Sequence, residues 1–158
     1  GSYSEVRNYP ADKLLKMPEN LDDKTVAALL MKRMTAHYLL YRTYPVQSGD
    51  TVLVHAAAGG MGLILCQWAK ALEATVVGAV STSEKAEVAR AAGCHYPVER
   101  SEKSFVDVVR EVTNGEGCAV VYEAIGKDTL QYFPWIVFAQ WAFARPTGMS
   151  QAHPIQSI

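Results

Sequence analysis

Four short, valine-rich segments alternate with helix-length segments along most of this chain. The expected strands are residues 51–56, 74–80, 95–98 (the weakest of the four) and 118–124, and the expected helices between them are residues 60–72, 83–92 and 104–113. A strand that returns to a parallel neighbour needs a crossover long enough to hold a helix. The first of these strands, residues 51–56, is apolar on both faces, as strands buried in parallel sheets tend to be. The sequence therefore predicts an α/β fold with a doubly wound parallel sheet of the Rossmann type.

A further amphipathic helix is predicted before the first strand, over residues 22–44, with Asp22 or Asp23 as its cap. Its apolar stripe comprises Val26, Leu29, Leu30, Met34, Tyr38, Leu39 and Tyr41. Residues 3–18 fit the alternation badly, and we expect a short strand and a turn there.

Charge and cysteine content limit the classes of partner. The 15 Lys and Arg residues are scattered among 16 Asp and Glu residues, which argues against a nucleic-acid partner. The longest apolar run is interrupted by Gln140 and is too short to cross a bilayer, so no membrane partner is expected. The three cysteines, Cys66, Cys94 and Cys118, lie in apolar segments, which favours buried thiols over disulfides. With no export signal in the sequence given, we expect a cytoplasmic protein.

A glycine-rich loop over residues 57–62 follows the first expected strand and opens the next helix. It is a variant of the dinucleotide fingerprint in which Ala57 takes the first glycine place, followed by Gly59, Gly60 and Gly62. Small residues there allow a sharp turn, close approach of a diphosphate and tight packing of helix on sheet. The pattern alone also fits a tight turn without a ligand. Its place between a strand and a helix favours a dinucleotide site, with the diphosphate at the helix N-terminus.

The end of the second expected strand indicates NADPH as the cofactor. Domains that bind NAD usually place a carboxylate there to hold the ribose hydroxyls. This strand continues into Ser81 and Thr82 instead, and Lys85 adds a cation one turn into the next helix. A small hydroxyl side chain and a cation suit a 2′-phosphate. Arg100 could flank the same pocket, although Lys85 and Arg100 would also be ordinary as solvated surface cations.

The loop and its surroundings resemble the zinc-free quinone oxidoreductases, the zeta-crystallin-like group of the medium-chain dehydrogenase superfamily. The similar strings are DTVLVHAAAGGMG at residues 50–62 and CQWAKAL at residues 66–72. The resemblance implies hydride transfer from NADPH to a quinone or another activated carbonyl compound. It also implies cofactor contacts at Gly60, Met61, Ser81, Lys85, Thr35 (near the nicotinamide), Ala124, Ile125 and Gly126. Relatives often have Tyr or His at the position of Arg100. A phosphate contact by Arg100 would therefore depart from the family pattern.

No metal site and no catalytic acid, base or nucleophile is predicted. Zinc-using members of the superfamily would have a cysteine where Met31 stands. The four histidines show no metal-ligand spacing with one another or with the cysteines. His55 and Tyr122 lie inside expected strands, so we do not expect either to be catalytic.

The chain departs from the family pattern at several positions. Arg33 and Glu73 replace glycines, and we expect a positive φ at Glu73, which costs a residue other than glycine about 1 kcal/mol. Residues 132–144 are longer and richer in Trp and Phe than the corresponding family segment. There we favour a core-facing helix over a partner-binding surface.

The predicted organisation is residues 1–20 as a remnant or linker of a substrate domain, and residues 21–158 as a C-terminally incomplete dinucleotide-binding domain. Relatives build the substrate pocket from further chain, so cofactor binding should survive better than turnover. The first hypothesis is the NADPH-binding domain of a quinone oxidoreductase. The alternatives are an enone or enoyl reductase of the same superfamily and a non-catalytic nucleotide-binding module. The resemblance also implies a homodimer formed through the sheet edge.

Overall fold

A computed structural model of the chain describes residues 3–99, 104–123, 126 and 137–143. The chain divides into two compact units, Gly1–Met31 and Lys32–Ile158. Among the described residues, no helix is long and apolar enough to cross a membrane.

The first unit contains the short 3₁₀ helix η1 (Ala11–Lys13) and the start of helix α1 (Asp23–Tyr38). The strand that we expected within residues 3–18 is wrong, because these residues form only bends and η1. They have no neighbouring strand to supply backbone hydrogen bonds, and Leu14 and Leu15 are exposed. The cap is Asp22, whose Oδ1 accepts the Thr25 N–H at 3.0 Å and whose Oδ2 accepts the Thr25 hydroxyl at 2.6 Å. These hydrogen bonds lower the pKa of Asp22.

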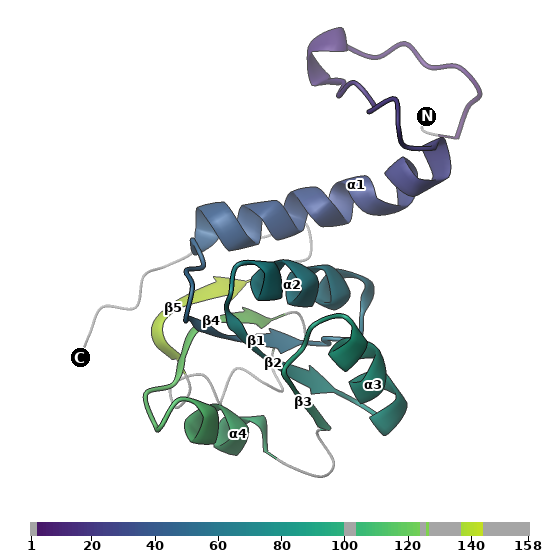
Figure 1. Cartoon of the computed structure of the whole chain (residues 1–158). Helices are drawn as coiled ribbons and strands as arrows, with labels where there is room; N and C mark the ends of the chain where they lie inside the picture. Colours follow the sequence, from purple (N-terminus) through teal and green to yellow (C-terminus); the bar gives the residue numbers. More distant parts are fainter. Residues whose placement is uncertain (1–2, 100–103, 124–125, 127–136, 144–158) are drawn as a thin grey trace. The chain divides into compact units, whose positions relative to one another are not determined.

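The second unit is built on a parallel sheet of five strands in the order β3-β2-β1-β4-β5 (Figure 1). The strands are β1 (Thr51–His55), β2 (Thr75–Val80), β3 (Tyr96–Glu99), β4 (Cys118–Glu123) and β5 (Val137–Phe143). The crossover helices are α2 (Gly60–Ala71), α3 (Ser83–Ala91) and α4 (Phe105–Val112). All four strand pairs are parallel. The predicted doubly wound α/β fold is confirmed, and the predicted bounds of β1 to β4 and α2 to α4 agree to within one residue.

Successive residues of each strand supply two separate cores. Val52, Val54 and Val76 pack with residues of α2 and α3 on one face of the sheet. Leu53, Val77 and Val121 pack with α4 on the other face. Figure 1 shows the same division, with α2 and α3 on one side and α4 on the opposite side. Because side chains alternate between the faces of a strand, a strand covered on both sides must be apolar throughout.

Strand β5 corrects the prediction of a core-facing helix over residues 132–144. Residues 137–143 pair in parallel with β4, from Cys118 opposite Val137 to Glu123 opposite Phe143. Periodicity alone does not separate a short buried helix from a buried strand, and the Val, Phe and Trp content of this segment favours a strand. The remaining residues of the predicted segment lie outside the described residues.

The helix that was predicted over residues 22–44 is α1 followed by a π-helical turn, η2 (Leu39–Thr43). Its apolar stripe was predicted only in part. Leu39 is buried as expected, together with Ala36 and Leu40. Tyr38 and Tyr41 are exposed instead, and aromatic contacts link His37, Tyr41 and Trp68 on this surface.

The three cysteines are free and buried, which confirms the prediction of buried thiols. Burial raises the pKa of Cys118 to about 12, so this thiol stays protonated near neutral pH.

The predicted positive φ at Glu73 is also confirmed, at 61°. Glu73 ends the turn between α2 and β2, where its carbonyl accepts the Gly49 N–H at 3.1 Å. Its carboxylate accepts the Ser48 hydroxyl at 2.9 Å, a contact at the surface. The backbone of this turn therefore requires a conformation that glycine adopts without strain.

We predict that Glu73→Gly raises the free energy of unfolding by about 0.5 kcal/mol. Relief of roughly 1 kcal/mol of backbone strain is partly offset by the greater freedom of glycine in the unfolded chain. Urea unfolding followed by circular dichroism measures the change. Glu116→Gly is the matched control, since Glu116 is exposed and has no positive φ. The control should lose stability, and an equal loss in both variants would contradict the strain at Glu73.

Candidate dinucleotide-binding site

The candidate site lies where the strand order of the sheet reverses. Strands β2 and β3 lie on one side of β1, and β4 and β5 lie on the other. In open parallel sheets, ligands bind beyond the carboxyl ends of the strands at such a switch point. The glycine loop follows β1 directly, so the fold places it at this point.

The loop turns sharply within four residues. Ala56 has a φ of 50°, and its carbonyl accepts the Gly59 N–H at 2.8 Å. Helix α2 then begins at Gly60, with Gly59 in an extended conformation at its N-cap. The first N–H groups of a helix have no partner within the helix, so the N-terminus of α2 can bind an anion.

Two glycines are required by close packing around this turn. A methyl group at Gly62 would collide with the carbonyl oxygen of Ala56 and lie 2.7 Å from Cα of Ala57. A methyl group at Gly78, on β2, would lie 2.7 Å from the methyl group of Ala57. Because Gly78 has no side chain, the fold accommodates alanine in the first glycine place of the fingerprint.

A hollow of about 190 Å³ joins the glycine loop to the end of β2. It is lined by Ala56, Ala58, Gly59, Ala79, Val80, Ser81 and Lys85. At its mouth, Lys85 Nζ donates a hydrogen bond to Ser81 Oγ at 2.9 Å. Thr82 caps α3 by accepting the Lys85 N–H at 3.3 Å. The lining contains one cation and no carboxylate, so it suits a negatively charged group.

The structure therefore gathers several of the predicted cofactor contacts. Gly59, Ser81 and Lys85 line one hollow, and Gly60, Met61 and Gly62 form the first turn of α2. Thr35 is half-buried on α1 and does not line the hollow. Arg100 and Ala124 lie outside the described residues.

Lys32 was not among the predicted contacts. A methyl group at Gly60 would lie 3.3 Å from Lys32 Nζ, so the structure places this ammonium group against the first residue of α2. Sequence reasoning missed it because α1 and the glycine loop are separated along the chain. A signal was present, since Lys32 and Thr35 are spaced to share a face of a helix.

The two strand residues that we did not expect to be catalytic are buried. Tyr122 is 3% exposed, and its hydroxyl donates to the Leu39 carbonyl at 3.5 Å. Burial raises the pKa of Tyr122, which disfavours the phenolate. His55 is also 3% exposed, at the end of β1.

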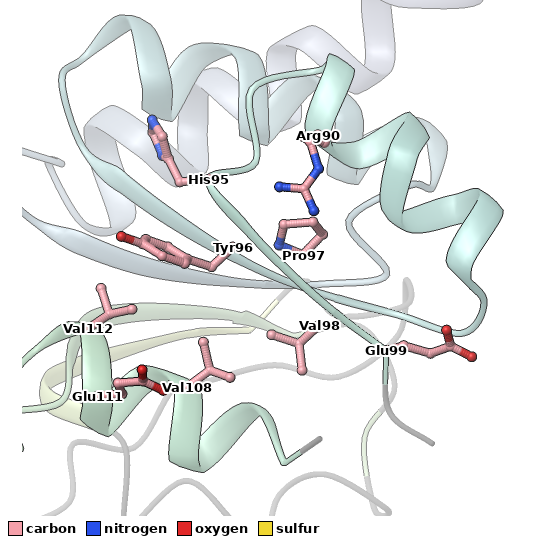
Figure 2. A pocket seen from close by; sticks show the side chains of 9 residues that line it. All are labelled: Arg90, His95, Tyr96, Pro97, Val98, Glu99, Val108, Glu111 and Val112. Carbon is pink, nitrogen blue, oxygen red and sulfur yellow. The ribbon is translucent and has the colours of Figure 1, made fainter. Parts of the chain in front are cut away.

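A larger hollow, of about 340 Å³, lies along β3 and α4 (Figure 2). It is lined by Arg90, His95, Tyr96, Pro97, Val98, Glu99, Val108, Glu111 and Val112. None of these residues belongs to the glycine loop, so this hollow is separate from the candidate dinucleotide site. Within the described residues, no group of three or more His, Cys, Asp and Glu side chains could hold a metal ion.

Comparisons with known proteins agree with this geometry. A family model described as zinc-binding dehydrogenase matches residues 60–133. The chain is 57% identical to a 2-haloacrylate reductase of Burkholderia sp over 133 residues, which cover 83% of this chain and 40% of that protein. It is 44% identical to a quinone oxidoreductase of Pseudomonas aeruginosa over 129 residues, which cover 82% and 40%. The chain thus spans about 40% of the length of these curated relatives.

Solved structures show the same relationship. The crystal structure of Escherichia coli quinone oxidoreductase complexed with NADPH matches with a TM-score of 0.80 and 40% identity, over 86% of this chain and 42% of that one. The crystal structure of a 2-haloacrylate reductase matches with a TM-score of 0.87 and 49% identity, over 98% and 50%.

The sheet order and the glycine loop define a Rossmann-type nucleotide-binding domain. Its sequence and structure belong to the quinone oxidoreductase family of the medium-chain dehydrogenase/reductase superfamily, which confirms the predicted resemblance.

We predict that Gly62→Ala lowers the free energy of unfolding by about 3 kcal/mol, because its methyl group meets backbone atoms that cannot rotate away. Gly60→Ala is the matched control. Its methyl group meets only the flexible side chain of Lys32, so we expect a change within about 0.5 kcal/mol. Urea unfolding of both variants checks the contrast. Similar losses of stability in the two variants would show that the close contact of Gly62 with the backbone of Ala56 and Ala57 does not determine the stability of the loop.

Proposed function

We propose that this chain is the NADPH-binding domain of an enzyme that transfers hydride to a quinone. The observation that carries the proposal is the joint position of the glycine loop and the Ser81–Lys85 pair around one hollow. The NADPH complex of the E. coli relative supports the choice of cofactor. In this proposal, residues 21–158 form the dinucleotide-binding domain and residues 1–20 link it to a substrate domain.

Lys85 and Ser81 would hold the 2′-phosphate of NADPH. The ammonium group and the hydroxyl lie 2.9 Å apart at the end of β2, where both can reach one phosphate. A charge-assisted hydrogen bond is about twice as strong as a neutral one. NADH has a hydroxyl group in place of this phosphate, so the pair would discriminate between the two cofactors. Arg100 stays a predicted contributor to the same pocket.

The diphosphate would bind at the N-terminus of α2. The N–H groups of Gly60 and Met61 lie in the first turn of this helix, where the helix dipole is positive. Lys32 adds a full positive charge against Gly60. Both cofactors contain the diphosphate, so these contacts would contribute equally to NADPH and NADH.

Thr35 and Ala124 would lie along the rest of the cofactor. Thr35 follows Lys32 by three residues on α1, so the two share a helix face, and the cofactor could extend from the diphosphate toward Thr35. NADPH supplies the hydride when bound, while the protein binds, orients and shields it. We expect none of the predicted contacts to act as a catalytic acid, base or nucleophile, so the proposed role of this domain is positioning.

The acceptor would be an electron-poor conjugated compound. We place a quinone first because several relatives are quinone oxidoreductases. An activated carbon–carbon double bond is the second candidate, since the 2-haloacrylate reductase shares 57% identity. Both acceptors are electron-poor conjugated systems that can be reduced by a hydride and a proton. The two candidates therefore require the same cofactor geometry and differ in the substrate pocket.

Two further proposals concern assembly and location. The described sheet has edge strands β3 and β5, and Pro97 in β3 has no N–H to donate. A homodimer through the sheet edge would thus pair more favourably along β5. The three free, buried thiols support a reducing, cytoplasmic compartment.

We predict that Lys85→Ala and Lys32→Ala affect the two cofactors differently. Lys85→Ala should lose about 1 to 3 kcal/mol of binding free energy for NADPH and little for NADH. Lys32→Ala should lose similar amounts for both, because the diphosphate is common to them. Fluorescence titration with each cofactor measures the four dissociation constants.

Lys70→Ala is the matched control, since Lys70 is exposed in the last turn of α2, at the opposite end from the loop. It should change neither affinity by more than about 0.5 kcal/mol. Equal losses of NADPH and NADH in Lys85→Ala would refute the 2′-phosphate contact. A parent chain that binds neither cofactor would refute the proposed function.

We predict that the enzyme containing this domain oxidises NADPH with a higher kcat/KM for 1,4-benzoquinone than for 2-chloroacrylate. Loss of NADPH absorbance with each acceptor measures the ratio, and product analysis identifies the bond that is reduced. A higher kcat/KM for 2-chloroacrylate would instead identify the enzyme as a reductase of activated carbon–carbon double bonds. NADPH binding without turnover of either acceptor would favour the non-catalytic module.

A further inference from the structure

His55 and Glu123 form a buried polar pair at the ends of two neighbouring strands of the sheet. His55 Nε2 lies 3.3 Å from Glu123 Oε2, and the two side chains are 0% and 1% exposed. They are the last residues of β1 and β4, which are neighbours in the sheet (Figure 1). Among the described residues, no other Asp, Glu, His, Lys or Arg side chain is buried.

The pair makes further contacts that fix its orientation. The His55 ring packs against the edge of Phe105, the first residue of α4, with ring centroids 5.0 Å apart. The second oxygen of the Glu123 carboxylate, Oε1, accepts the backbone N–H of Gly126 at 3.1 Å. Gly126 has a φ of 92°, which favours glycine. Glu123 therefore connects His55 to the backbone beyond the end of its own strand.

The position of the pair coincides with the switch point of the sheet. The residue after His55 is Ala56, which starts the glycine loop with a φ of 50°. Glu123, which accepts the Gly126 N–H, is the last residue of the neighbouring strand, β4. One polar link thus joins the two loop origins between which a ligand of this fold binds.

Stability alone does not account for this choice of residues. Replacing a buried ion pair with well-packed apolar residues is often neutral or stabilising. The rest of the surrounding core is apolar, comprising Leu53, Val77, Val98, Phe105, Val106, Val108, Val109, Cys118 and Val121. Apolar side chains would fill the same space, but they would not orient the Gly126 N–H or link it to β1.

We propose that His55 and Glu123 are positioning residues, which hold the glycine loop and the Gly126 N–H at the spacing that the dinucleotide requires. This inference rests on the proposed function. The pair acts through the backbone and touches no part of the cofactor that differs between NADPH and NADH. Its removal weakens binding of both cofactors by the same factor, unlike removal of Lys85.

The test compares three variants of the chain by NADPH and NADH titration and by urea unfolding. Glu123→Leu removes the links to His55 and Gly126, and we expect dissociation constants about tenfold higher for both cofactors. Glu123→Gln keeps an oxygen for the Gly126 N–H and an amide for His55, so its dissociation constants should stay within about twofold of the parent. Val121→Ala is the control, since it deletes buried volume two residues earlier on the same face of β4. It should lose stability and keep its affinity.

An unchanged affinity in Glu123→Leu would overturn the inference, and so would a rise limited to NADPH. If Glu123→Leu does not fold, His55→Leu/Glu123→Leu, which buries neither polar group, takes its place with the same expectation. A parent chain that binds neither cofactor refutes the proposed function together with this inference. A parent that binds both, with a Leu variant that binds them equally well, refutes the inference alone.

Discussion

The close approach of helix α2 to the end of β1 is the constraint on which the rest of the site depends. A side chain at Gly62 would meet the backbone of Ala56 and Ala57, so the helix can lie this near only because glycine is there. The approach brings the free N–H groups of the first helical turn to the switch point of the sheet. Gly78 serves the same approach from β2, where its missing side chain leaves room for Ala57. The capacity of this place to bind an anion is therefore a consequence of packing.

Local pattern was enough to predict most of the fold, and it failed where the outcome depended on distant neighbours. Strands β1 to β4 and helices α2 to α4 are long, apolar or well capped, so periodicity placed them to within one residue. β5 was predicted as a helix, because a short aromatic segment takes the structure of the edge that it meets, and that edge is β4. Residues 3–18 were predicted as a strand and have no neighbouring strand. The stripe on α1 failed similarly, since Tyr38 and Tyr41 stay exposed while Ala36 is buried.

In the candidate site too, local sequence pattern predicted some residues, and contacts between distant segments decided the others. Gly59, Ser81 and Lys85 could be predicted because each lies within five residues of the end of a strand, and carboxyl ends of parallel strands meet at one edge. Lys32 could not, because it reaches the loop from a helix outside the alternating pattern. The pairing of His55 with Glu123 depends on the register between β1 and β4, which a single sequence does not contain. Thr35 and Ala124 remain predictions from family resemblance, and Arg100 remains a prediction from its place after the third expected strand.

In the proposed site, different residues would provide affinity for any dinucleotide and discrimination between NADPH and NADH. In the proposed site, Lys32 on α1 and the N–H groups of α2 would bind the diphosphate that both cofactors share, whereas Lys85 on α3 would bind the phosphate that only NADPH carries. These groups belong to different helices, and a change in one leaves the backbone of the others in place. The His55–Glu123 pair lies beneath both, in the sheet, and sets the spacing of the loops that carry the shared contacts. Cofactor preference in such a domain can therefore change through the end of β2 alone, while the apolar sheet and its His55–Glu123 pair stay constant.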